Sequence, residues 1–156
     1  MGKMTAATLA LDKAGVAYEL HTYDYDPGAP RVGLQAAESL GIAPDRVLKT
    51  LMTLVDGKPV CAVLASDQEV AMKKLATAAG GKSATMMKPA DAERITGYRV
   101  GGVSPFGQKK QVPTLVDAAA MSRSRVYVNG GQRGLQVELS PEDLVAALGA
   151  KIASLT

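Results

Sequence analysis

The chain has little of what disulfide-bonded and metal-binding proteins require. Its 156 residues include one cysteine, Cys61, and one histidine, His21. A single cysteine cannot form an intramolecular disulfide, and one cysteine with one histidine cannot supply the ligand cluster that structural zinc needs. We therefore expect no disulfide framework, no metal site and no cofactor.

Long hydrophobic runs are also missing. The longest apolar stretches, such as residues 60–65, are far shorter than the roughly 20 residues that cross a bilayer. Asp12 and Lys13 interrupt the N-terminal apolar segment before it resembles a signal sequence, and Ala6 stands where a myristoylation motif needs Ser or Thr. These absences favour a cytoplasmic location.

Several catalytic motifs are absent as well. The sequence contains no Gly-x-Ser-x-Gly elbow, no His-Glu-x-x-His pair, no closely spaced carboxylates, no phosphate-binding Gly-Lys-Ser/Thr and no dinucleotide fingerprint after a strand. ATP and NAD are therefore not expected as ligands. Catalysis would need a nucleophile from elsewhere, held beside a cation or backbone amides that stabilise an oxyanion.

The composition that remains is that of one globular domain spanning residues 1–156. The chain is 47% hydrophobic and 21% charged, with a net charge of +3. A chain of this length and polarity can bury a core of its own. The positive charge permits a polyanionic partner but does not require one.

The pattern of apolar and turn residues predicts a mixed α+β fold. Helices are expected over residues 4–14, 32–40, 69–79, 89–95 and 141–148, the third of them capped by Ser66 or Asp67. Strands are expected over residues 16–23, 47–55, 60–65, 114–117, 125–128 and 135–139, with a loop over 26–30. Asp56-Gly57 and residues 129–131 each predict a hairpin, so we expect a largely antiparallel curved sheet or barrel flanked by helices.

Lys49 is the most informative single residue. It interrupts a strand that is otherwise apolar or hydroxyl-bearing, and it shares a face with Leu51 and Val55. Burying an unpaired ammonium costs several kcal/mol. Lys49 therefore either reaches solvent from an edge of the sheet or meets an anion, and we favour the anion.

Residues 96–110 form a glycine-rich loop that ends in Lys109-Lys110. Backbone N–H groups in such a loop can bind a phosphate or an oxyanion, although the segment is also compatible with a plain connection. Lys109 and Lys110 either contact a phosphate backbone or are solvated. In contrast, the apolar surroundings of Cys61 and the core-like Met86-Met87 pair indicate structural roles, as does the lack of a local Ser or Cys partner for His21.

Three segments in order resemble the YbaK family of free-standing aminoacyl-tRNA deacylases. They are residues 47–51, residues 96–98 with 100–110, and residues 130–135, and the likeness extends to residues 21–23 and 113–114. The resemblance implies a mixed α/β fold related to the editing insertion of bacterial prolyl-tRNA synthetases. It also implies a misacylated tRNA as substrate, cysteinyl-tRNA(Pro) with cysteinyl-tRNA(Cys) as a second candidate, and prolyl-tRNA synthetase as a candidate partner.

The resemblance also implies site residues. Lys49 would hold the terminal adenosine or the ester, and the loop would line the aminoacyl pocket through Gly101, Gly102, Val103, Ser104 and Pro105. Tyr23 and Thr50 would be neighbours of the pocket. Val32 and Gln136 stand where some relatives have an aromatic and an acidic residue, so pocket shape and charge would differ there.

The chemistry implied for the family needs no protein nucleophile, because the thiol of the cysteinyl substrate attacks its own ester and leaves as a thiolactone. Two alternatives stay open. A sister group removes alanine from tRNA(Pro) with water, and a non-catalytic module would only bind tRNA or a synthetase. A small-molecule phosphate binder is a third candidate.

Overall fold

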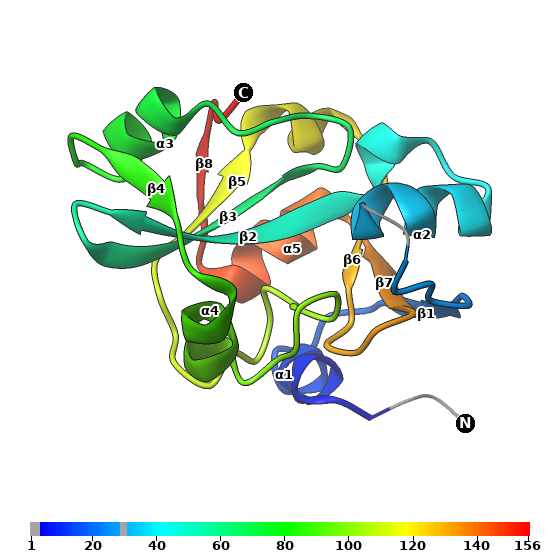
Figure 1. Ribbon diagram of the computed structural model, residues 1–156. Coiled ribbons are helices and arrows are strands. Elements are labelled where there is room, and N and C mark those ends of the chain that lie inside the picture. The colour runs from blue at the N-terminus through cyan, green and yellow to red at the C-terminus, as the bar shows by residue number, and fades with distance from the viewer. Residues whose placement is uncertain (1–3, 29–30) are drawn as a thin grey trace.

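The strands of the protein form two sheets in the computed structural model, which describes residues 4–28 and 31–156 (Figure 1). One sheet has five strands in the order β4-β2-β3-β5-β8, and the other has three in the order β1-β7-β6. Four of the six strand pairs are antiparallel. The expected mixed α+β class with largely antiparallel strands is confirmed. Of the two expected arrangements, a curved sheet or a barrel, the strands form open sheets: over the described residues they do not close into a barrel.

The five-stranded sheet is built on the predicted hairpin. β2 (Leu48–Val55) pairs antiparallel with β3 (Lys58–Ala65) through the Asp56-Gly57 turn. Both turn residues have positive φ, 49° and 79°, as a type I′ hairpin turn requires. The other strands add at the two edges: β4 (Ala84–Met86) antiparallel to β2, β5 (Thr114–Asp117) parallel to β3, and β8 (Lys151–Ala153) parallel to β5.

The three-stranded sheet meets the first at the beginning of β2. It contains β1 (Glu19–Thr22), β6 (Val126–Asn129) and β7 (Leu135–Leu139), all antiparallel. A single parallel bridge joins Val47 to Tyr127 of β6. The residues that follow Val47 therefore lie at a seam between the two sheets.

Helices cover both faces of the five-stranded sheet (Figure 1). The helices of the described residues are α1 (Ala6–Lys13), α2 (Val32–Leu40), α3 (Met72–Ala78), α4 (Pro89–Thr96) and α5 (Pro141–Leu148), with 3-10 turns η1 (Pro44–Arg46) and η2 (Ala118–Ser122). Leu75 of α3 packs on Val55 and Val60 on one face. Leu11 of α1 and Leu144 of α5 belong to the core on the other face. No helix among the described residues is long and apolar enough to cross a membrane.

The caps of the helices are partly as predicted. Ser140 caps α5, since its hydroxyl accepts a hydrogen bond from the Asp143 N–H at 3.1 Å, and Gly41 ends α2 in the left-handed conformation. The prediction that Ser66 or Asp67 caps the third helix is wrong. That helix begins at Met72 without a side-chain cap, because Ser66 extends the hairpin instead: its N–H and hydroxyl both donate to the Val47 carbonyl.

Other expectations are confirmed or corrected residue by residue. Cys61 is fully buried, and burial raises the pKa of its thiol to about 12, which confirms a core role. Met87 is buried, but Met86, at the end of the edge strand β4, is 48% exposed, so a core role is wrong for Met86. Ala29 and Pro30 of the predicted loop lie outside the described residues.

Candidate active site

A cavity of about 380 Å³ lies at the seam between the two sheets. Six of the residues predicted for the site line it together: Lys49 and Thr50 of β2, Val32 of α2, Gly101 and Val103 of the glycine-rich loop, and Gln136 of β7. The sequence reasoning missed the four other polar residues of the lining, Arg31, Ser66, Glu69 and Asn129. The sequence indicates the helices, strands and turns that carry these four residues. It does not indicate that they meet at one cavity, because that depends on how distant segments pack.

Lys49 is half-buried in this cavity. Burial lowers the pKa of its ammonium, and the positive charge of Arg31 lowers it further, against the opposite influence of Glu69 and Asp67. Within residues 4–28 and 31–156 the Lys49 ammonium has no hydrogen-bond or ion-pair partner. Two cations, Lys49 and Arg31, thus line the cavity with one carboxylate, Glu69, and the excess of positive charge suits an anion or a carbonyl oxygen that gains negative charge.

Buried polar atoms beside Lys49 also lack partners. Thr50 Oγ1, Gln136 Oε1 and the Tyr23 hydroxyl are buried and make no hydrogen bond in the described part of the chain. Gln136 is 2% exposed. An unsatisfied buried polar group costs about 1–3 kcal/mol, and a bound ligand that pairs with these atoms would remove that cost.

Tyr23 itself lies beside the cavity rather than in its lining. It borders a neighbouring hollow with Arg133 and Gly134. Burial raises the pKa of the Tyr23 hydroxyl, with a further contribution from Tyr25, while the Gln136 side chain acts in the opposite direction. The Tyr23 hydroxyl therefore lies close to the Gln136 side chain, which lines the cavity, while Tyr23 itself does not.

The glycine-rich loop contributes backbone donors. The N–H groups of Gly101 and Val103, both in the lining, have no hydrogen-bond partner among the described residues, whereas the Gly102 N–H donates to the Arg99 carbonyl at 2.8 Å. The Asn129 amide holds the loop in place by donating to the Gly101 carbonyl at 3.3 Å. The amides of Gly101 and Val103 are thus free to donate to an oxyanion.

The remaining predicted residues lie elsewhere. Ser104 is fully buried beneath the loop: its hydroxyl accepts from the Phe106 N–H at 3.2 Å, and its carbonyl accepts from the Gln108 amide at 3.0 Å. Pro105 is also buried and is not in the cavity lining. Lys109 and Lys110 are exposed, and Lys110 lines a different cavity.

A group of potential metal ligands lies on the three-stranded sheet, outside this cavity. Oxygen and nitrogen atoms of Glu19, His21 and Glu138 lie within 4.8 Å of one another. His21 Nε2 is 2.8 Å from Glu138 Oε1, and Arg125 Nε is 3.2 Å from Glu138 Oε2. Burial of the Glu138 carboxyl favours its neutral form, but the hydrogen bonds from His21 and Arg125 outweigh it and lower the pKa. The guanidinium already neutralises the carboxylate, which indicates a structural ion pair.

The chain is similar in sequence and in fold to several known proteins. A sequence model of the aminoacyl-tRNA editing domain family matches residues 27–147. Over 121 residues the chain is 44% identical to EbsC of Enterococcus faecalis, a candidate Cys-tRNA(Pro)/Cys-tRNA(Cys) deacylase, covering 77% of this chain and 74% of EbsC.

Two further likenesses concern proline-specific proteins. The proline–tRNA ligase of Acidithiobacillus ferrooxidans is 33% identical over 95 residues, which cover 61% of this chain and 16% of the ligase. The crystal structure of a candidate trans-editing enzyme for prolyl-tRNA synthetase superposes with a TM-score of 0.82 at 21% identity, covering 99% of both chains. This last likeness concerns the fold.

Proposed function

Because the chain belongs to the aminoacyl-tRNA editing domain family, we propose that it is an aminoacyl-tRNA deacylase that removes cysteine from Cys-tRNA(Pro), with Cys-tRNA(Cys) as a second substrate. The kinship with EbsC supports the substrate class. The reaction would be trans-editing, carried out in the cytoplasm by a single domain and without a cofactor.

The observation that carries the proposal is the set of unsatisfied groups around the Lys49 cavity. A half-buried ammonium, two free backbone amides and the unpaired oxygens of Thr50 and Gln136 surround about 380 Å³. An aminoacyl ester complements them, because its carbonyl oxygen becomes negative during reaction and its α-ammonium needs acceptors. We assign Lys49 with the Gly101 and Val103 amides to the carbonyl oxygen, and Gln136 with Thr50 to the ammonium.

The nucleophile in this proposal is the substrate's own thiol. Its sulfur bonds to the ester carbonyl carbon, the bond from that carbon to the ribose oxygen breaks, and the thiol proton passes to the ribose oxygen. The products are a thiolactone and tRNA with a free hydroxyl. The enzyme supplies position and charge, which suits a cavity whose lining contains no cysteine or histidine among the described residues.

The deciding experiment measures release of labelled amino acid from cysteinyl-, alanyl- and prolyl-tRNA(Pro), with S-methylcysteinyl-tRNA(Pro) as the matched control. We expect rapid release of cysteine and at least about a 100-fold loss on S-methylation, since the blocked sulfur cannot attack as a thiolate. Prolyl-tRNA(Pro), the correctly charged form, is expected to be stable.

The other outcomes assign the protein differently. Release of alanine at a rate equal to or above that of cysteine would show the water-dependent sister specificity. A folded protein that releases nothing from any of the four substrates would be a binding module, and the deacylase proposal would be wrong.

Replacing Gln136 by leucine tests whether this residue binds the substrate or only stabilises the fold. Gln136→Leu removes an unpaired buried acceptor at nearly constant volume, so we expect the melting temperature to stay level or rise. Deacylation should fall about tenfold, mainly through KM, because one acceptor for the α-ammonium is lost. Gln136→Glu, which keeps an oxygen acceptor, should retain activity; equal activity of the leucine variant and the wild type would remove Gln136 from the site.

Binding of the tRNA outside its acceptor end, and of a partner protein, would involve surface residues away from the cavity. We propose that Lys109 and Lys110 contact the phosphate backbone, since both side chains are exposed. Prolyl-tRNA synthetase is the candidate partner that would present the tRNA. Addition of that synthetase should accelerate cysteine release from tRNA(Pro) if the proposal holds.

A further inference from the structure

A second cavity lies at the opposite end of β2 from Lys49. Its volume is about 750 Å³, within the range of roughly 300–1,000 Å³ typical of small-molecule sites. Val55 in its lining is six residues along the strand from Lys49, which corresponds to roughly 20 Å at the usual rise. The cavity is therefore separate from the site proposed for the aminoacyl ester.

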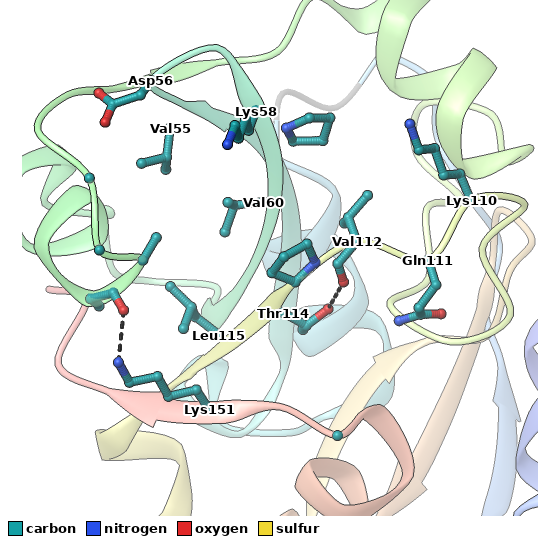
Figure 2. A pocket seen from close by; sticks show the side chains of 17 residues that line it. Val55, Asp56, Lys58, Val60, Lys110, Gln111, Val112, Thr114, Leu115 and Lys151 are labelled. Atoms are coloured by element: carbon teal, nitrogen blue, oxygen red, sulfur yellow. Dashed lines mark hydrogen bonds between the residues drawn. The ribbon is translucent and has the colours of Figure 1, made fainter.

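The floor of this cavity is aliphatic (Figure 2). Val55, Val60, Val112 and Leu115 form it, and each is nearly buried. The lining contains no aromatic ring among the described residues. Nucleic-acid bases are usually held by stacking on aromatic rings, so this floor suits an aliphatic group better than a base.

Three lysines, Lys58, Lys110 and Lys151, stand around the floor in Figure 2. Lys151 Nζ donates to the Ala78 carbonyl at 3.0 Å. The ammonium groups of Lys58 and Lys110 have no hydrogen-bond or ion-pair partner in the described ranges. The rim therefore carries positive charge that the protein does not neutralise.

The acidic and hydroxyl groups of the lining are already engaged. The Asp56 carboxylate accepts hydrogen bonds from the N–H groups of Lys82 and Ser83 at 3.0 and 3.1 Å. The Thr114 hydroxyl donates to the Val112 carbonyl at 3.2 Å. These groups are not arranged for proton transfer, so the cavity is equipped for binding rather than for catalysis.

We propose that this cavity binds a small aliphatic organic anion, with its hydrocarbon part on the valine and leucine floor and its carboxylate or phosphate headgroup among Lys58, Lys110 and Lys151. The aliphatic part gains the free energy of leaving water. The headgroup is attracted to a rim that carries two unpaired ammonium groups, those of Lys58 and Lys110. Lys110 is shared with the tRNA contacts proposed above, whereas Lys58, Lys151 and the floor residues take no part in the deacylase proposal.

Sodium decanoate and monodecyl phosphate, below their micelle concentrations, are the probes, followed by calorimetry and by amide chemical shifts of the isotope-labelled full chain. We expect saturable binding with shifts centred on Val55, Val60 and Leu115. Decyltrimethylammonium, which has the same tail and the opposite charge, should bind at least about tenfold more weakly, as should succinate, which lacks the tail.

Two triple variants with the same change in net charge complete the test. Lys58→Gln with Lys110→Gln and Lys151→Gln should weaken decanoate binding about tenfold or more. Lys13→Gln with Lys73→Gln and Lys88→Gln, all exposed and outside the lining, should leave it unchanged. Absence of saturable binding, equal binding of the cationic detergent, or equal weakening by both triple variants would overturn the proposal.

Discussion

Replacing Lys49 by alanine is expected to slow cysteine release from Cys-tRNA(Pro) by about 100-fold or more while the protein stays folded. Loss of one group that stabilises a developing oxyanion usually costs a factor of this size. The fold should not suffer, because the half-buried ammonium lacks a partner and its burial disfavours the charged form. Single-turnover deacylation and thermal unfolding of the same preparation measure both effects.

Two further variants show whether charge or bulk is responsible. Lys49→Met keeps the aliphatic stem without the charge and should be as slow as the alanine variant. Lys73→Ala removes an exposed lysine on α3 and should react like the wild type. Unchanged turnover in folded Lys49→Ala would exclude Lys49 from the site.

Gly102→Ala is expected to reduce deacylation at least about tenfold and to lower the melting temperature. A Cβ at this position would lie 2.9 Å from the Arg133 nitrogen and 3.0 Å from the Gln132 carbonyl carbon. Both are backbone atoms, so the loop must move away from the β6-β7 connection. Gly101 and Val103 would then be displaced together with the free amides that we assign to the ester oxygen.

Gly15→Ala is the matched control for this substitution. Gly15 has a φ of 71°, and nothing lies within 4 Å of a Cβ built there. Alanine at Gly15 should cost about 1 kcal/mol of backbone strain and leave deacylation unchanged. If the two variants lose stability equally and Gly102→Ala keeps full activity, the loop position does not matter for the reaction.

Local signals in the sequence predicted much of the fold. The turn at Asp56-Gly57 and the cap at Ser140 each depend on residues close in sequence, and both are confirmed. The strands Ala84–Met86 and Lys151–Ala153 were not predicted, because each has three residues and exists only through pairing with a distant strand. The parallel pairing of β5 likewise has no local signature.

The candidate site was predictable to the same extent. Lys49 was recognisable as a charge in an apolar strand, and the glycine-rich loop was recognisable by composition. The sequence could not indicate that the Gly102 N–H donates to the Arg99 carbonyl while the Val103 N–H has no partner among the described residues. That difference depends on the backbone conformation of the loop. Nor could it bring Asn129 to Gly101, because the two residues are 28 positions apart.

The Val47–Tyr127 bridge affects the width of the cavity that contains Lys49. Lys49 and Thr50 come from one sheet and Gln136 from the other, so the gap between them depends on the angle at which the two sheets join. Val47 and Tyr127 form that joint, and Arg46 stacks on Tyr127 with 5.6 Å between the guanidinium carbon and the ring centroid. If the cavity holds the aminoacyl ester as proposed, substitutions at the joint would widen or narrow the space for its side chain without changing a lining residue, so selectivity could be altered from outside the pocket.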